Sequence, residues 1–299
     1  MDRVRYVATE DSLDFARKLA EGLGLDFDRE AAAADAPFLL SVYYCEAIGV
    51  LGEAFSSIEI ADFSRRTIDA YAARSRQGRA YLHVDQHFDF WMFGLCLLWT
   101  EAALVGVPKD KEETFDALFL ALLDLDCGIG THEEIRERVS PWIEGAGNRL
   151  RVAHDLSVAC FLSVVCHELA HHSLGHLNMD GSWEVELEAD REGFKMIQRL
   201  FADPRSLDLI PHQPYSLAAP WVVLNLIDAS ERRAAQRAGE RLIHTSSSHP
   251  PARNRLAVLA PLMALVTDRS PQLASFAEGY NHALRGIFEA TGLATIETP

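Results

Sequence analysis

Apolar side chains recur at helical spacing along most of the chain, and signals for strands are scarce. Acidic or capping residues begin the periodic runs, and glycine or proline ends most of them. The predicted helices cover residues 11–24, 36–55, 62–78, 90–107, 109–126, 131–139, 149–177, 182–201, 216–238, 251–266 and 271–291, with one short strand at 79–84. This pattern predicts a mainly α fold with at most a small β element.

The clearest interruption of the helical pattern is the sequence SPWIEGAGN at residues 140–148, which combines proline with glycine. Such residues punctuate regular structure. The interruption predicts an N-terminal helical region, residues 1–147, that covers a cleft. Residues 148–299 are predicted to form a compact core that carries the chemistry, followed by C-terminal helices.

The most apolar segment, residues 90–107, contains Glu101 in its interior. A membrane span needs roughly 20 mostly apolar residues, and one buried charge costs about 2.5–3.5 kcal/mol on insertion scales. The segment is therefore predicted to be a buried core helix. The first residues contain no apolar signal region, and the five cysteines form no C-x-x-C pair, so we expect a cytoplasmic protein with reduced thiols.

The composition narrows the choice of partners. Hydrophobic residues make up 48% of the chain and charged residues 24%, which is typical of soluble globular proteins. The net charge is −16, from 44 acidic and 28 basic side chains. Such a surface repels nucleic acid and anionic membranes, so neither is an expected partner. The oligomeric state is left open.

The helix predicted at 149–177 contains the sequence His167-Glu168-Leu169-Ala170-His171. A spacing of four residues places both imidazoles on one helix face, where they can bind the same Zn²⁺ ion. In this H-E-x-x-H pattern the glutamate acts as general base toward the attacking water. The preceding turns are apolar on every side, which indicates a buried helix. We therefore predict a zinc site with Glu168 as the catalytic base.

A third zinc ligand is expected on the next helix, because a catalytic site keeps three protein ligands and one open position. One stripe of that helix is fully charged and typical of a solvated face: Glu188, Arg191, Glu192, Lys195 and Arg199. A second stripe includes small residues that allow close helix packing: Glu186, Ala189, Asp190, Gly193 and Ile197. Glu186 is therefore the predicted ligand. Asp190 either orients a ligand histidine by hydrogen bonding or forms a simple salt bridge.

Other histidines are interpreted as structural. His176, at the end of the motif helix, is expected to bind a carbonyl or the helix dipole. His172 is expected to be a packed or exposed side chain. His83 and His87 share the spacing of four but lack the glutamate, and are assigned a structural role with a minor possibility of substrate contact.

The sequence HELAH followed by ELEAD resembles the gluzincin class of zinc peptidases, which again selects Glu186 and Asp190. Residues 248–255, SHPPARNR, resemble a motif of the CAAX prenyl peptidases and the heat-shock membrane protease HtpX. The resemblance implies that His249 stabilises the oxyanion and that Arg255 orients His249 or pairs near Asp190. The alternative is a rigid helix start with Arg255 on the surface. Those relatives are membrane proteins, whereas no convincing span is found here.

Fourteen residues separate His171 from Glu186, which suits a minimal gluzincin core. The chain length and the central HELAH are also similar to the bacterial phage-exclusion Lit proteases, cytosolic metallopeptidases that cut a translation elongation factor. We therefore expect a zinc-dependent endopeptidase that acts on a selective protein substrate, with a role in phage exclusion or host defence. The alternatives are a non-catalytic peptide-binding protein that retains the metal site, or a membrane-associated housekeeping metallopeptidase.

Overall fold

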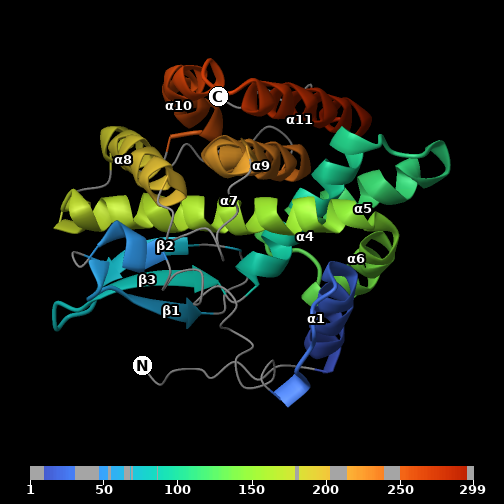
Figure 1. Cartoon of the computed structure of the whole chain (residues 1–299), viewed down its shortest axis with the longest axis horizontal. Coiled ribbons are helices and arrows are strands. Elements are labelled where there is room, and N and C mark those ends of the chain that lie inside the picture. Colours follow the sequence, from blue (N-terminus) through green and yellow to red (C-terminus); the bar gives the residue numbers. More distant parts are fainter. Residues whose placement is uncertain are drawn as a thin grey trace.

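The computed structural model describes residues 10–30, 47–52, 55–63, 68, 70–85, 87–178, 182–202, 214–238 and 250–294. Within them the fold is mainly α with one small sheet, as predicted. Helix α7 (Asn148–Ser173) runs through the middle of the molecule. The sheet lies along one side of α7 near its C-terminal end, and α8, α9, α10 and α11 lie on the opposite side (Figure 1). The C-terminal end of α7 is therefore enclosed from two sides.

The helices follow the predicted ranges closely in most of the chain. Apolar residues at helical spacing form the buried face of each helix, and the two 3-10 turns η2 (Lys109–Lys111) and η3 (His176–Asn178) flank α5 and α7. The remaining helices are α1 (Glu10–Leu23), α4 (Phe88–Leu104), α5 (Glu112–Asp126), α6 (His132–Ala146), α8 (Trp183–Ala202), α9 (Pro214–Ala238), α10 (Ala252–Thr267) and α11 (Pro271–Ala290). Of the helix predicted at 36–55, the described residues show helix at 47–51.

The sheet has three strands in the order β1-β3-β2: β1 (Glu59–Phe63), β2 (Ala70–Arg74) and β3 (Ala80–Asp85). β1 pairs with β3 in parallel, whereas β2 pairs with β3 in antiparallel orientation, with Ala72 opposite Leu82. β3 agrees with the strand predicted at 79–84. In this order β2 is an edge strand, and it is the strand that lies nearest the motif on α7, because the N–H of Ala72 bonds to Glu168.

The helix predicted at 62–78 is wrong, because this segment forms the end of β1 and all of β2. Its alanines favour a helix, but local propensity is weak beside tertiary pairing. β3 supplies a ladder partner for β2, and Tyr71 stacks on His83 directly across the ladder with ring centroids 4.8 Å apart. Cross-strand aromatic pairs of this kind stabilise a sheet, so the partner strand decided the conformation.

The break predicted at residues 140–148 is also wrong in extent. α6 continues through Pro141 to Ala146, and the chain turns at Gly147, which has a φ of 55°. An interior proline costs a helix about 3 kcal/mol or more. Trp142 and Ile143 follow it and are both buried, and the burial of two large side chains offsets a cost of that size. The proposed boundary at residue 147 therefore coincides with the turn between α6 and α7.

The apolar segment that begins at residue 90 forms α4, a 17-residue helix that is buried from Phe90 to Glu101. Glu101 accepts a hydrogen bond from Nε of Arg149 on α7 at 2.7 Å, so its charge is compensated within the core. α4 is a core helix, as predicted. Among the described helices, α7 is long and apolar enough to cross a membrane, but 72% of its most apolar window is buried inside the structure.

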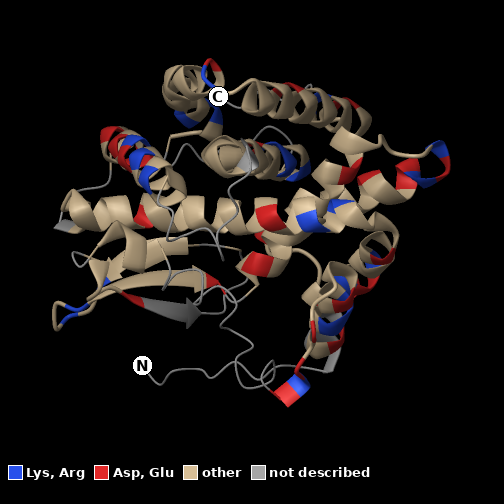
Figure 2. Cartoon of the chain, in the orientation of Figure 1, with Lys and Arg blue, Asp and Glu red and all other residues tan. Residues whose placement is uncertain are grey.

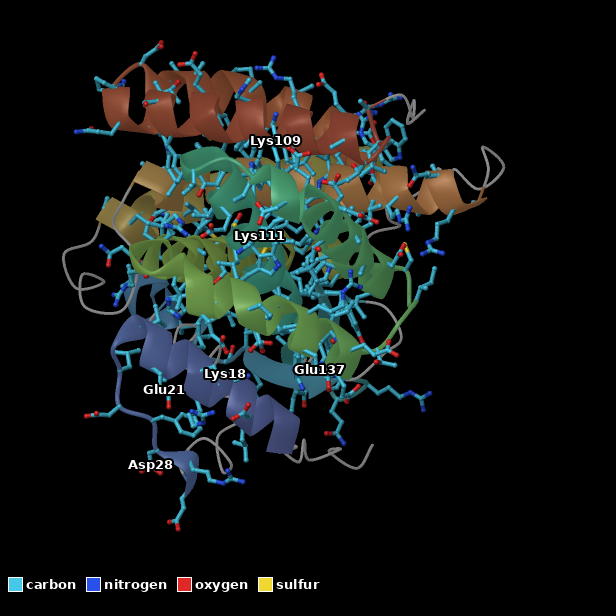
Figure 3. The ribbon with its side chains drawn as sticks, turned by 90° about the vertical axis from the view of Figure 1, so that its right-hand side faces the viewer. Lys18, Glu21, Asp28, Lys109, Lys111 and Glu137 are labelled. Atoms are coloured by element: carbon cyan, nitrogen blue, oxygen red, sulfur yellow. The ribbon has the colours of Figure 1, made fainter. Side chains whose placement is uncertain are left out.

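Charged side chains lie mainly on the outer elements of the molecule. The first half of α8 carries acidic residues and most of its basic residues follow them (Figure 2), and Glu192 pairs with Lys195 at 2.8 Å. The opposite end is formed by α1 and α6, and Figure 3 views it directly. Nζ of Lys18 on α1 lies 4.0 Å from Oε1 of Glu144 on α6. On α8, the predicted charged stripe is a solvated face, and the other stripe of this helix faces α7.

Candidate metal centre

Two histidines and one glutamate meet where α8 crosses the C-terminal part of α7. The Nε2 atoms of His167 and His171 lie 3.2 Å apart. The carboxylate of Glu186 on α8 lies 3.4 Å from Nε2 of His167 and 3.5 Å from Nε2 of His171. Each residue offers one donor atom, and all three atoms lie within 4.8 Å of one another. This group could hold a metal ion.

The charges around the group also favour a cation. A cavity of about 520 Å³ opens on it and is lined by residues of β2, α4, α5, α7, η3, α8, α9 and α10. Among the described residues, its lining includes one guanidinium, Arg255, and four carboxylates, those of Asp126, Glu168, Glu186 and Asp190. Buried charges require compensation. The excess of carboxylates is the kind of environment that a divalent cation balances.

Asp190 orients His167. Its Oδ1 lies 3.0 Å from Nδ1 of His167, and Arg255 donates two hydrogen bonds to the same carboxylate, at 2.9 and 2.7 Å. Nη2 of Arg255 also lies 3.4 Å from Nδ1 of His167, but the carboxylate is nearer. Because a carboxylate only accepts, the shorter contact assigns the proton to Nδ1 of His167 and leaves Nε2 toward the group. The side chain of Arg255 is 12% exposed and pairs with Asp190, so the alternative that places it on the surface is wrong. Burial by itself disfavours the charged forms of Asp190 and His167. Arg255 nevertheless lowers the pKa of Asp190. Asp190 and Glu186 raise the pKa of His167 to about 9.

His171 has a different partner, His176, in the turn η3. The two Nδ1 atoms lie 3.2 Å apart, and Nε2 of His176 lies 3.3 Å from Oε2 of Glu188. Burial and the neighbouring His167 lower the pKa of His171 to about 3, so its neutral form is favoured. The predicted partner of His176, a carbonyl or the helix dipole, is wrong, because its side chain contacts His171 and Glu188. Its position five residues after His171 is a weak signal, because a turn must reverse the chain first.

Glu168 is buried beside the group and anchored by one oxygen. The backbone N–H of Ala72 donates to its Oε2 at 2.6 Å, and its Oε1 lies 4.0 Å from Nε2 of His167. Burial is the main cause that raises the pKa of Glu168 to about 7. One oxygen is thus held by β2 while the other faces the three donor atoms. A carboxyl group with this pKa can exchange a proton near neutral pH.

The other histidines considered from the sequence take part in packing. His172 is half-buried and its Nε2 lies 3.0 Å from the carbonyl oxygen of Tyr81. His83 stacks on Tyr71, and the ring of His87 stacks on that of His132 with centroids 3.6 Å apart. None of these three residues lines the cavity as far as the structure describes it.

His249, the predicted oxyanion donor, lies outside the described residues. Pro251, two residues further on, is described and precedes α10, whose first N–H, at Ala252, donates to the carboxylate of Glu231 at 3.1–3.2 Å. α10 therefore begins where the motif predicts a helix start. From this helix Arg255 reaches the centre.

Comparisons with known proteins add no relative. No family model, curated protein or solved structure matches this chain.

Proposed function

We propose that this chain is a zinc-dependent endopeptidase in which Glu168 is the general base. One observation carries the proposal: a single buried carboxylate lies between a group of three metal donors and the edge strand β2. A metal-dependent hydrolase of peptide bonds needs a metal, a base and a place for an extended chain. Each of these three requirements has a candidate here: Glu168 is bonded to Ala72 of β2 at 2.6 Å and lies 4.0 Å from Nε2 of His167.

The donor set supports zinc as the metal. Two imidazole nitrogens and one carboxylate oxygen make up a common catalytic zinc set that keeps one position open. Donor atoms 2.0–2.1 Å from a tetrahedral ion lie about 3.3–3.4 Å from one another. The two Nε2 atoms, 3.2 Å apart, lie close to that separation, and the two oxygens of Glu186 lie 3.4 Å from Nε2 of His167 and 3.5 Å from Nε2 of His171, one oxygen to each. Bound zinc would act as a Lewis acid that activates water and polarises a carbonyl.

Glu168 would move the proton. Its Oε1 faces the donor group and is placed to accept a proton from the attacking water and to return it to the leaving amine. The hydrogen bond from Ala72 to Oε2 fixes the orientation of the carboxylate. Its pKa of about 7 suits both acceptance and return of a proton. The burial of the group excludes bulk water from competing at Oε1.

The edge strand supports a peptide as the substrate. Ala72 and Leu82 are directly opposite in the ladder, and the N–H of Ala72 points away from β3 to Glu168. In an antiparallel ladder, the N–H and C=O of one residue share a side, so the backbone at Ala72 faces the cavity. The N–H of Ala72 itself is bonded to Glu168, but an extended peptide can pair with the other backbone groups on this side of the edge. The burial of Glu168 and Glu186 within the cavity favours a selective substrate over general digestion.

The test combines metal analysis with identification of cleavage products. The purified chain is expected to contain about one equivalent of zinc. Wild type and Glu168→Gln are incubated with a cell lysate, and new peptide termini are identified by mass spectrometry. Glu168→Gln is expected to keep the zinc but to lose about 10²–10⁴-fold in cleavage rate, the usual scale for a positioned base. New termini that appear equally with both proteins would refute the proposed role of Glu168.

A further inference from the structure

We propose that His176 and Glu188 are positioning residues for the metal centre: they fix the tautomer of His171 so that its Nε2 lone pair faces the metal position. The inference rests on the proposed function, because it uses the same metal site, but it does not require that the protein cleaves peptides. It concerns two residues that the H-E-x-x-H pattern does not include.

Glu188, the last member of the series His171–His176–Glu188, determines which atom donates in each hydrogen bond. Glu188 can only accept, so Nε2 of His176, 3.3 Å from its Oε2, is the donor. A neutral imidazole carries one proton, which leaves Nδ1 of His176 as an acceptor. The atom 3.2 Å from it is Nδ1 of His171, which must then donate. Nε2 of His171 is left as a lone pair beside Glu186 and His167.

Because both side chains are buried, the hydrogen bond between His171 and His176 favours one tautomer of His171. The side chain of His176 is 3% exposed, and that of His171 is 10% exposed. Water therefore has little access to the two Nδ1 atoms, and a buried donor without an acceptor costs about 1–3 kcal/mol. The alternative tautomer of His171 would bring two Nδ1 lone pairs together at 3.2 Å and place a proton at the metal position. The pair therefore disfavours the tautomer that cannot bind metal.

The fold supplies His176 by a reversal at the end of α7. Gly175 has a φ of 75°, a left-handed conformation that glycine adopts without strain. The N–H of Gly175 bonds to the carbonyl of His172 at 3.3 Å, and η3 then returns the chain over the last turn of α7. His176 is thereby placed behind His171, on the side away from Glu186.

The two ligand histidines are thus held by different means. His167 is fixed by Asp190, a buried carboxylate that pairs with Arg255. His171 is fixed by an imidazole whose own partner, Glu188, is 58% exposed. Because solvent screens an exposed charge, the contribution of Glu188 is expected to be smaller than that of His176.

The experiment compares variants that keep or remove the acceptor. In His176→Asn, Oδ1 lies the same number of bonds from Cα as Nδ1 of histidine and remains an acceptor; in His176→Leu none remains. Glu188→Gln is compared with Glu192→Gln, the same change on the solvated face of α8. Zinc affinity of the full chain is measured by competition with a chelator. The tautomer of His171 is read from imidazole ¹⁵N chemical shifts of the metal-free protein.

His176→Leu is expected to weaken zinc binding about 10–100-fold, the usual effect of removing a partner of a ligand histidine, and to shift His171 from the Nδ1–H form toward a mixture. His176→Asn should restore most of the affinity and the tautomer. Glu188→Gln should lose several-fold at most, and Glu192→Gln should match wild type.

Two results would overturn the proposal. Either His176→Leu keeps both the wild-type affinity and the wild-type tautomer, or His176→Asn is as weak as His176→Leu, which indicates packing alone. If the wild-type chain binds no zinc, the proposed function fails, but the ¹⁵N shifts of the metal-free variants still decide the tautomer. If zinc binds and no peptide is cleaved, the peptidase fails and the positioning role stands.

Discussion

Gly193 of α8 lies against the backbone of His167 of α7, so that a Cβ built at Gly193 would be 3.0 Å from the Cα of His167. Two helices can approach this closely at Gly193 because glycine has no Cβ atom. Glu186 lies two helical turns before Gly193 on the same helix. The close crossing therefore sets the distance from Glu186 to the two histidines, and the metal centre depends on a residue that binds no metal.

Gly193→Ala is expected to push α8 away from α7 and to separate Glu186 from the histidines. Overpacking of this kind costs about 1–3 kcal/mol of stability, and metal affinity should fall with it. Urea unfolding and zinc titration measure the two effects. Gly286→Ala is the control, because a Cβ there meets nothing within 4 Å in an exposed part of α11. An unchanged affinity in Gly193→Ala would mean that the crossing does not set the site.

Glu186→Ala is expected to lower zinc binding far more than Glu192→Ala. The carboxylate of Glu186 is buried 3.4–3.5 Å from two imidazole nitrogens, whereas Glu192 pairs with Lys195 on the solvated face. The metal content of both variants after dialysis, measured by elemental analysis, checks the prediction. Equal retention by the two variants would exclude Glu186 as a ligand.

Asp190→Asn is expected to preserve the fold but to lower metal affinity about 10–100-fold, since the amide holds Nδ1–H of His167 less firmly than a carboxylate does. The change also removes the ion pair of Asp190 with Arg255. Chelator competition gives the affinity, and far-ultraviolet circular dichroism checks the fold. A folded variant with wild-type affinity would show that Asp190 serves only the ion pair.

Asp124 at the end of α5 supplies a test of pH dependence away from the metal centre. Arg233 donates to its carboxylate at 2.8 and 2.9 Å, and Arg237 donates to it at 2.7 Å. Burial opposes the charge, but the two guanidinium groups outweigh it and lower the pKa of Asp124. Asp124→Asn should therefore lose about 1–3 kcal/mol of unfolding free energy at pH 7, the scale for a hydrogen bond to a charged group.

The sign of the pH dependence follows from the lowered pKa. The native carboxylate stabilises the fold above the unfolded-state pKa of about 3.9. This stabilising contribution is lost as the pH falls through the lower pKa that Asp124 has in the folded protein. The difference between wild type and Asp124→Asn should therefore be constant above about pH 5 and shrink below about pH 4. Urea unfolding at several pH values measures it, with the exposed Glu113→Gln on α5 as control. A difference that grows in acid would contradict the assignment.

Most of the helices and most of the donor group could be predicted from the sequence, because both depend on local periodicity; the helix predicted at 62–78, which forms strand, is an exception. Residues four apart share a helix face whatever surrounds the helix, so His167 and His171 had to be neighbours. The charged stripe of α8 had to face solvent, which left Glu186 as the inward carboxylate. These inferences needed only the period of 3.6 residues and the cost of burying charge.

Only the tertiary structure decided the features that join distant segments. The alanine-rich segment at 70–74 became a strand because β3 was available to pair with it. Its N–H then met Glu168, 96 residues later. Arg255 turned inward because Asp190 was there to compensate its charge, and His176 reached His171 because a turn reversed the chain. Such contacts depend on where other segments are in space, and no local pattern in the sequence encodes that position.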